Sequence, residues 1–216
     1  MESLKSLFSG RNGFLAFVVL YLLFFGYLQN KFSQEELFLA INRLNSPSLD
    51  TFFYFITYLG DGIFFGLIIL ILLFKKYSQA LLGLVVFIST SFAAQFLKRV
   101  VFSDDLRPFA ELGNEYSLHQ VEGVKQVMTL SFPSGHTTTA FALGMFLAWK
   151  ILPSYWGWFL GILAALVGYS RVYLGQHYIE DIYVGAILGV GLTWLNIWWL
   201  SDRLELKFGE RSILVK

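Results

Sequence analysis

Six stretches of this chain are long enough and apolar enough to cross a lipid bilayer as helices. They lie at about 12–30, 51–74, 77–97, 130–149, 151–170 and 182–201, and each is rich in Leu, Ile, Phe and Gly. A helix needs roughly 20 residues to cross about 30 Å of hydrocarbon, and the stretches lack the alternation of a lipid-facing barrel strand. The sequence therefore predicts an all-α polytopic membrane protein, a bundle of six transmembrane helices.

The composition sets the class of protein before any motif is considered. Apolar residues make up 56% of the 216 residues and charged residues only 14%, a balance that excludes an ordinary soluble domain. We expect a single integral membrane domain over residues 1–216, with its core at about 50–200, and no nucleic-acid partner. The chain has no cysteine, so a disulfide and a thiolate metal site are both excluded.

Six crossings place both chain ends on one side of the membrane, and the distribution of Lys and Arg indicates which side. With cytoplasmic termini, nine of these cations lie inside: Lys5, Arg11, Lys75, Lys76, Lys150, Arg203, Lys207, Arg211 and Lys216. Seven lie outside: Lys31, Arg43, Lys98, Arg99, Arg107, Lys125 and Arg171. Four of those seven belong to the polar clusters described next, and setting them aside leaves nine against three. We therefore expect cytoplasmic termini in a plasma membrane, the inner membrane of a bacterium.

Four polar clusters interrupt the apolar sequence. They are Lys98-Arg99 with Arg107-Pro108, Pro133-Ser134-Gly135-His136, Ser170-Arg171, and His177 with Asp181. In the predicted topology the third helix ends, the fourth begins, the fifth ends and the sixth begins at these clusters. All four then lie at the outer face of the membrane. The clusters are identified by residue type and the topology by hydropathy, so the two are independent. The location of all four clusters at one face therefore supports a real site facing the periplasm or exterior.

The cations of these clusters are suited to hold a phosphate group. Arg107 and Arg171 offer planar sets of donors that match phosphate oxygens. Lys98 or Arg99 adds a further positive charge. The turn at Ser134-Gly135 precedes the fourth helix, where backbone N–H groups and the positive end of the helix dipole face an anion. Any one of these cations alone is more often an ordinary interfacial residue, but several of them beside two histidines favour an anion site.

Two histidines and an aspartate have the spacing of a nucleophile, its orienting carboxylate and a general acid. His177 and Asp181 are four residues apart and share one face if they open the sixth helix. Asp181 can then accept the Nδ1–H of His177 and leave Nε2 free to attack phosphorus. His136 can protonate the leaving oxygen. A lone histidine more often makes a structural hydrogen bond, and that is the role expected of His119.

These motifs resemble the three-part signature of the type 2 phosphatidic acid phosphatase (PAP2) superfamily: Lys-x6-Arg-Pro, Pro-Ser-Gly-His and Ser-Arg-x5-His-x3-Asp. The second part stands unchanged at 133–136, and the third stands unchanged from Ser170 to Asp181. The resemblance covers residues from about 50 to 200. It implies a bacterial membrane phosphatase that acts on a phosphorylated lipid without a metal ion or other cofactor.

The resemblance also implies a role for each residue at a matching position. His177 would form a phosphohistidine and Asp181 would orient it. His136 would protonate the leaving group and later activate water. The phosphoryl oxygens would be held by Arg107, Arg171, the first-motif cation and the backbone of Ser134 and Gly135.

The first part of the signature is altered in this chain. Seven residues before Arg107 stands Val100 instead of lysine, and the nearest cations are Arg99 and Lys98. A longer connection can still close, because residues 103–105 resemble a flexible insertion. Adjacent positions on a helix point about 100° apart, so only one of the two cations is expected to face the site. Residue type favours Lys98 over Arg99.

Three further segments lie outside the motifs. The polar extracytoplasmic loop at about 109–129 is long enough to be a lid or a substrate-selecting loop, and it fits an ordinary solvated connector equally well. Residues 32–45 have the pattern of an amphipathic helix lying in the outer interface. Asp61, between two glycines of the second span, is expected to mark the start or a bend of a helix.

Two other classes of function compete with a lipid phosphatase. A metal-dependent membrane hydrolase could use His136, His177 and Asp181 as ligands, but the neighbouring cations would repel a divalent ion. A non-catalytic lipid-binding or transport protein on the same fold would tolerate loss of His177, which is present here. Members of the family act on phosphatidic acid, phosphatidylglycerol phosphate, undecaprenyl pyrophosphate or lipid A phosphates, so a phosphomonoester or pyrophosphate of such a lipid is the expected substrate.

Overall fold

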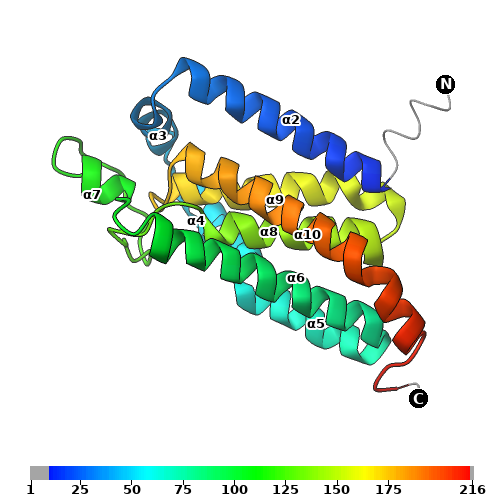
Figure 1. Ribbon diagram of the computed structural model, residues 1–216. Helices are drawn as coiled ribbons and strands as arrows, with labels where there is room; N and C mark the ends of the chain where they lie inside the picture. Colours follow the sequence, from blue (N-terminus) through cyan, green and yellow to red (C-terminus); the bar gives the residue numbers. More distant parts are fainter. Residues whose placement is uncertain (1–9, 215–216) are drawn as a thin grey trace, which may run out of the picture.

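The computed structural model describes residues 10–214, which form helices joined by turns and one long loop (Figure 1). The longer helices are α2 (Gly10–Lys31), α4 (Pro47–Ile56), α5 (Gly62–Lys75), α6 (Tyr77–Phe96), α8 (Gly135–Phe146), α9 (Gly157–Tyr173) and α10 (Ile179–Phe208). The shorter elements are α3 (Gln34–Asn42), α7 (Pro108–Leu112), η1 (Thr57–Gly60), η2 (Leu97–Val101), η3 (Leu147–Ile151) and η4 (Ser154–Trp156). Residues 10–214 contain no strand, which confirms the predicted all-α fold. Lys5 and Lys216, which enter the charge distribution, lie outside the described residues.

Helix length and hydropathy identify fewer membrane spans than the sequence predicted. Among the described residues, three helices are long and apolar enough to cross a bilayer: Asn12–Lys31, Tyr77–Val101 and Ile179–Phe208. The bent pair Pro47–Gly60 and Gly62–Lys75 makes a fourth if it counts as one span. Helices α8 and α9 have only 12 and 17 residues. The predicted count of six is not confirmed, because the fourth and fifth predicted spans include irregular chain at their ends.

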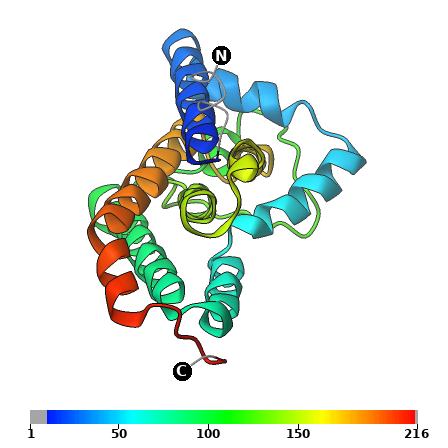
Figure 2. The ribbon, with the colours of Figure 1, turned by 90° about the vertical axis from the view of Figure 1, so that its right-hand side faces the viewer.

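Helix α8 is the centre of the bundle, and the other long helices surround it (Figure 2). All its side chains from Thr137 to Phe146 are buried. One apolar cluster joins α8 to α2 and α9 and includes Phe14 and Phe141. A second cluster joins it to α5, α6 and α10 and includes Phe65 and Phe146. Because α8 is packed on all sides, the position of its N-terminus is fixed.

Two glycines bring α10 against the backbone of α8. A Cβ at Gly185 would lie 2.8 Å from the carbonyl oxygen of Ser134. A Cβ at Gly189 would lie 2.4 Å from the carbonyl oxygen of Thr138. Small residues four apart allow such an approach between membrane helices. The contact places the first turn of α10 beside the start of α8, where the N–H of Ser134 donates to the carbonyl oxygen of Asp181 (3.0 Å).

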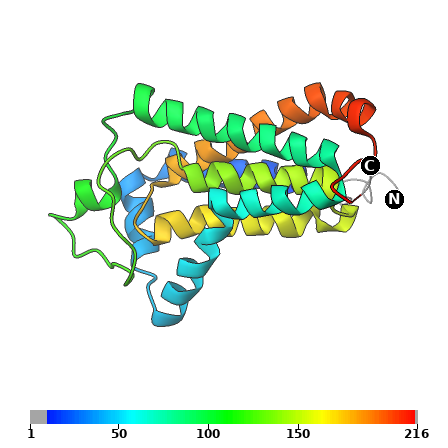
Figure 3. The same cartoon turned by 90° about the horizontal axis from the view of Figure 1, so that it is seen from below.

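A sharp bend separates α4 from α5, and α4 projects from the bundle (Figure 3). The segment Pro47–Gly60, which contains α4 and η1, differs in direction from α5 by 51°. Asp61 lies at the break and caps α5, because its carboxylate accepts the N–H of Ile63 (2.8 Å). The acid that interrupts the second predicted span therefore marks the start of a helix, as the sequence indicated.

Gly60 lies in this bend, where the chain touches α8 and α9. A Cβ at this position would lie 2.5 Å from Val167 Cγ1 and 2.7 Å from the carbonyl oxygen of His136. We expect Gly60→Ala to lower the melting temperature of the purified protein, at a cost of about 1–3 kcal/mol. Gly66→Ala is the matched control, since nothing lies within 4 Å of a Cβ there and alanine favours a helix. Equal melting temperatures for the two variants would contradict this close contact.

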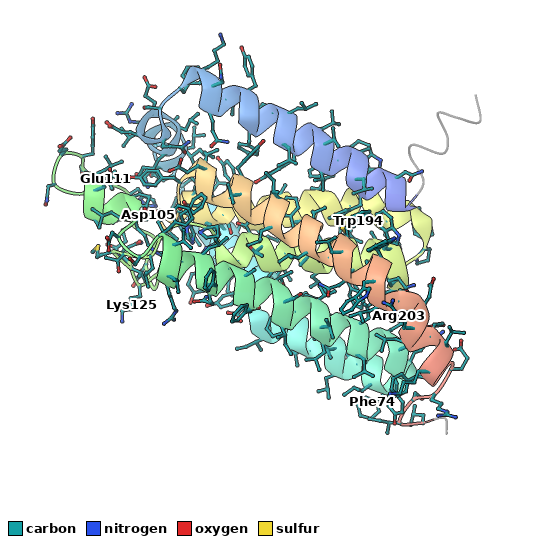
Figure 4. All side chains as sticks on the ribbon, viewed as in Figure 1. Phe74, Asp105, Glu111, Lys125, Trp194 and Arg203 are labelled. Atoms are coloured by element: carbon teal, nitrogen blue, oxygen red, sulfur yellow. The ribbon has the colours of Figure 1, made fainter. Side chains whose placement is uncertain are left out.

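The two ends of the bundle carry different parts of the chain (Figures 1 and 4). Helices α3 and α7 and the long loop lie at one end, where Figure 4 labels Asp105, Glu111 and Lys125. The start of α2 and the end of α10 lie at the other end, near Phe74 and Arg203. Both described ends of the chain therefore lie opposite the long loop.

The amphipathic segment predicted at 32–45 contains α3. Ser33 and Glu36 form a capping box that fixes the start of this helix. Leu37 and Phe38 are buried in a cluster with apolar residues of α7, α9 and α10. The protein covers this part of the apolar face, while Phe32 and Leu44, near the two ends of the segment, are exposed.

Candidate active site

The residues selected from the sequence lie on elements that meet at the end of the bundle carrying α7 (Figure 1). In chain order, they are Lys98 and Arg99 in η2, Arg107 before α7, Ser134, Gly135 and His136 at the start of α8, Arg171 in the last turn of α9, His177 in the turn before α10, and Asp181 in its first turn. Six of the nine are less than one-tenth exposed: Lys98, Arg107, Ser134, Arg171, His177 and Asp181. Polar groups buried together at helix ends require hydrogen-bond partners. Among these six described residues, each has such a partner, and the Nε of Arg171 is a buried donor left without one.

His177 and Asp181 form a buried hydrogen-bonded pair. His177 Nδ1 lies 2.9 Å from Asp181 Oδ2, and each side chain is 2% exposed. The same carboxylate oxygen accepts the N–H of Tyr178 (3.1 Å). A carboxylate accepts from Nδ1–H, so the neutral imidazole keeps its lone pair on Nε2. The pair has the arrangement required of a nucleophilic histidine.

Lys98 and Arg99 have different surroundings, although they are adjacent. Lys98 is buried, and its Nζ donates to the carbonyl oxygen of Ser131 (3.1 Å). Arg99 is exposed, and its Nε donates to Gln95 Oε1 one turn earlier on the same helix (3.0 Å). Of the two cations left open by the sequence, Lys98 is the one directed toward the other site residues.

A wider helical turn accompanies the altered spacing of the first motif. Residues Leu97–Val101 form a π turn, in which the N–H of Phe102 donates to the carbonyl oxygen of Leu97 (2.8 Å). A π turn takes up one residue more than an α turn. The longer connection between Lys98 and Arg107 is thus accommodated partly inside the helix end.

Arg107 is held by four hydrogen bonds. Its Nε donates to the carbonyl oxygen of Thr129 (3.0 Å), and its Nη2 donates to that of Leu130 (3.2 Å). Its Nη1 donates to the carbonyl oxygen (3.2 Å) and to Oε1 (2.9 Å) of Gln176. Gln176 donates in turn to Gln126 Oε1 (2.7 Å). A guanidinium has five donors, so one N–H of a rigidly placed Arg107 remains for an anion.

Arg171 is buried at the end of α9 and is tied to the bend between α4 and α5. Its Nη1 donates to Thr57 Oγ1 in η1 (2.9 Å). Within the described part of the chain, its Nε is buried without a hydrogen-bond partner. An unsatisfied buried donor is costly. A phosphate oxygen is the kind of acceptor that this N–H requires.

The N-terminus of α8 presents backbone donors. Ser134 is the N-cap: its Oγ accepts the N–H of Thr137 (3.5 Å) and its carbonyl oxygen accepts that of Thr138 (3.0 Å). The amides of Gly135 and His136 precede the first intrahelical hydrogen bond. Nothing lies within 4 Å of a Cβ built at Gly135. An anion can therefore approach these two amides at the positive end of the helix.

Burial and the nearby positive charges both lower the pKa of His177. Burial lowers the pKa of His177 well below its ordinary value. The positive charges of Lys98, Arg107 and Arg171 lower that pKa further. Burial also lowers the pKa of Arg107, against the opposing effect of the Asp181 carboxylate. At neutral pH the imidazole of His177 is thus unprotonated, the form that can act as a nucleophile.

Three residues that sequence reasoning did not select hold the site together: Ser131, Thr57 and Gln176. Ser131 Oγ donates to Asp181 Oδ2 (2.5 Å), while the other two fix the guanidinium groups described above. Their only signal in the sequence is position, since Ser131 lies close to the second motif and Gln176 directly precedes His177. Thr57 has no such neighbour.

The loop at 109–129 is fastened across this end of the bundle. His119 Nε2 lies 2.9 Å from Asp50 Oδ1 at α4. The backbone N–H and carbonyl oxygen of His119 pair with the side-chain amide of Asn42 (2.9 and 3.0 Å). Gln126 Nε2 donates to the carbonyl oxygen of Leu174 (3.2 Å). His119 therefore makes the structural contacts expected of it, and the contacts of His119 and Gln126 tie the loop to α3, to α4 and to the turn after α9.

An all-helical bundle with a buried histidine–aspartate pair among three cations has the architecture of a membrane phosphatase. The model of the PAP2 superfamily matches residues 79–205, and the chain belongs to this family. It is 31% identical to lipid A 4'-phosphatase of Porphyromonas gingivalis over 73% of this chain and 68% of that protein. It is 29% identical to undecaprenyl-diphosphatase of Sulfolobus acidocaldarius over 85% of this chain and 87% of that protein.

A solved structure shares the fold. The crystal structure of Aquifex aeolicus LpxE aligns with a TM-score of 0.67 and 26% identity, covering 76% of this chain and 94% of that one. The two named relatives are phosphatases, and the family is the one that the motifs indicated. The chain is accordingly an enzyme of the phosphoric ester hydrolase class.

Proposed function

We propose that this protein is a membrane lipid phosphate phosphatase that cleaves a phosphomonoester or pyrophosphate of a lipid through a phosphohistidine at His177. The observation that carries the proposal is the buried His177–Asp181 pair with three cations close enough to lower the pKa of the imidazole. A neutral nucleophile surrounded by fixed positive charge is suited to attack a polyanionic phosphorus centre.

In the first step, Nε2 of His177 attacks phosphorus, and the bond from phosphorus to the lipid oxygen breaks. Asp181 holds the Nδ1–H and stabilises the positive charge that develops on the ring. His136, at the start of α8, protonates the leaving oxygen.

In the second step, water hydrolyses the phosphohistidine. His136, now neutral, takes a proton from the water molecule while its oxygen attacks phosphorus. The nitrogen–phosphorus bond breaks, and orthophosphate and the neutral form of His177 result. The same two histidines therefore complete the cycle with all protons balanced.

The phosphoryl oxygens are held by donors on four segments. Lys98, Arg107 and Arg171 supply charge, and the backbone amides of Gly135 and His136 supply directed N–H groups. The buried Nε–H of Arg171, which has no hydrogen-bond partner among the described residues, and the one N–H of Arg107 left by its four hydrogen bonds fit this role. These fixed donors stabilise the transition state without reorganising.

A metal-dependent hydrolase is the first alternative. His136, His177 and Asp181 would be its ligands, but Asp181 Oδ2 already accepts from three donors and His177 Nδ1 faces that oxygen. Within residues 10–214 there is no group of three or more His, Asp or Glu side chains arranged to hold a metal ion. The cations favour an anion there instead.

The substrate class is a lipid that carries a terminal phosphate or pyrophosphate. The named relatives act on lipid A and on undecaprenyl diphosphate, and both molecules present such a group at a membrane surface. The test is phosphate release by purified protein from phosphatidic acid, phosphatidylglycerol phosphate, undecaprenyl pyrophosphate and lipid A, each with excess chelator. Release from at least one lipid supports the proposal. A folded protein that binds these lipids without releasing phosphate would instead be a binding or transport protein.

We further propose that α8 and α9 also cross the membrane, as part of a single domain with six spans. They lie beside the three helices that meet the length criterion, and α8 is continued by the turn η3. With cytoplasmic termini, the site and the 109–129 loop then face the periplasm or exterior, since they lie at the opposite end of the bundle.

Thiol labelling tests this orientation, because the chain has no cysteine of its own. We expect Ser117→Cys, at an exposed position of the loop, to react with a membrane-impermeant thiol reagent in intact cells. Asp202→Cys, exposed near the end of α10, is the control and should react only after permeabilisation. The reverse pattern would place the site in the cytoplasm.

A further inference from the structure

Ser131 lies at the point where the cation site and the histidine–aspartate pair meet. It is 2% exposed and sits in irregular chain before α8. Its N–H donates to the carbonyl oxygen of Asp105 (3.2 Å), and its own carbonyl oxygen accepts from Lys98 Nζ (3.1 Å). Its hydroxyl donates to Asp181 Oδ2 (2.5 Å). All three polar groups of this residue are therefore engaged inside the site.

The hydroxyl of Ser131 completes a set of three donors on one carboxylate oxygen. Asp181 Oδ2 also accepts from His177 Nδ1 (2.9 Å) and from the N–H of Tyr178 (3.1 Å). The amide is fixed by the first turn of α10, and the hydroxyl approaches from a different segment of the chain. Because these donors come from two separate segments, they hold the carboxylate in a single orientation. In that orientation it accepts the hydrogen bond from the imidazole.

The backbone around Ser131 is held in an uncommon conformation. Leu130 has φ +58°, in the left-handed region that side chains other than glycine rarely adopt. The carbonyl oxygens of Thr129 and Leu130 accept from Arg107, and that of Ser131 accepts from Lys98. Local strain of this kind persists where the surrounding contacts determine it and is concentrated at functional sites. Here it directs three successive carbonyl groups at the two cations.

We propose that Ser131 is a positioning residue for the phosphoryl transfer, acting through Asp181 on the nucleophile His177. The proposal rests on the proposed function. The hydroxyl holds the Asp181 carboxylate so that Nε2 of His177 points at phosphorus, and the carbonyl group of the same residue sets the position of Lys98. Ser131 itself does not touch the phosphate.

Removal of the hydroxyl should slow the chemical step and leave substrate binding nearly unchanged. We expect Ser131→Ala to lower kcat by about 10- to 100-fold, the order seen when outer partners of metal-ligating histidines are removed. KM should stay within about threefold, because the carbonyl contact to Lys98 is kept by alanine. Ser103→Ala is the matched control, since Ser103 also donates to a carboxylate, that of Asp104, but on the exposed surface (3.1 Å).

A double-mutant cycle separates positioning from general structural support. In an Asp181→Ala background the hydroxyl has no carboxylate to orient, so adding Ser131→Ala should change kcat by less than about threefold. The wild type and each variant are assayed on the same lipid, with folding checked by gel filtration in detergent. If Ser131→Ala does not fold, Ser131→Cys replaces it, because a thiol has a similar size and is a weak donor.

The outcomes for Ser131 and for the proposed function are distinct. A wild-type protein that hydrolyses none of the lipid phosphates overturns the proposed function, and the role of Ser131 with it. An active wild type with unchanged kcat in folded Ser131→Ala, or losses that multiply in the double variant, overturns the positioning role alone. A selective loss of kcat that disappears in the Asp181→Ala background supports it.

Discussion

His177→Ala is expected to abolish phosphate release from every lipid that the wild-type protein hydrolyses. The loss should be on the order of 10⁴-fold or more, because surrounding charges cannot replace a covalent nucleophile. The side chain is almost fully buried, and its Nδ1 contacts only the carboxylate of Asp181 among the described residues. Phosphate release is measured on the purified variant after gel filtration has shown that it is folded in detergent.

The control for this prediction is the other histidine with an aspartate partner. His119 contacts Asp50 and Asn42, and neither of these partners belongs to the site. We expect His119→Ala to retain activity within a few fold of wild type. Substantial turnover by folded His177→Ala, or an equal loss in His119→Ala, would rule out His177 as the nucleophile.

Lys98→Ala should show the second-largest loss, on the order of 10²-fold in rate, comparable with removal of one oxyanion-hole donor. Lys98 is buried beside Ser131, and its charge acts on His177 together with those of Arg107 and Arg171. Removing it takes away charge that stabilises the phosphoryl oxygens in the transition state. The measurement is kcat/KM for lipid hydrolysis at low ionic strength.

Arg99→Ala is the adjacent control with the same change of charge. Arg99 is exposed and hydrogen-bonded to Gln95 on the same helix, so its removal should cost only a few fold. Screening by salt should reduce this small effect further. The opposite ranking of the two variants would mean that the π turn presents Arg99 to the phosphate instead.

The residues of the second and third motifs could be selected from the sequence because their chemistry depends on short spacing. His177 and Asp181 are one helical turn apart, so a local rule already places the carboxylate beside the imidazole. Ser134 before an apolar run is a helix N-cap, and the amides that follow it face outward for the same local reason. The all-α fold follows from the long apolar stretches.

The supporting contacts could not be predicted, because they join segments far apart in the chain. Ser131 meets Asp181 across 50 residues, and Thr57 meets Arg171 across 114. Serine and threonine are common at helix ends for local reasons, so residue type alone does not mark these two. Only the packing of α8 against α10, and of the α4–α5 bend against α9, brings the partners together.

Helix boundaries and burial were also beyond sequence reasoning. The apolar run at 130–149 predicts one span, but residues 130–134 are irregular and supply carbonyl groups and the N-cap of the site. Hydropathy does not separate such chain from a helix. Likewise, the amphipathic pattern at 32–45 does not predict that Leu37 and Phe38 pack on α7, α9 and α10. An amphipathic pattern does not distinguish a protein surface from lipid.

The stereochemical course at phosphorus tests the central claim, covalent catalysis by His177, most directly. A lipid phosphorothioate monoester made chiral with two oxygen isotopes and sulfur is hydrolysed by the wild-type protein in water labelled with the third oxygen isotope, with excess chelator, and the configuration of the released thiophosphate is determined. Two in-line displacements, first by His177 Nε2 and then by water, predict overall retention of configuration. Inversion would show a single displacement by water and would contradict the phosphohistidine.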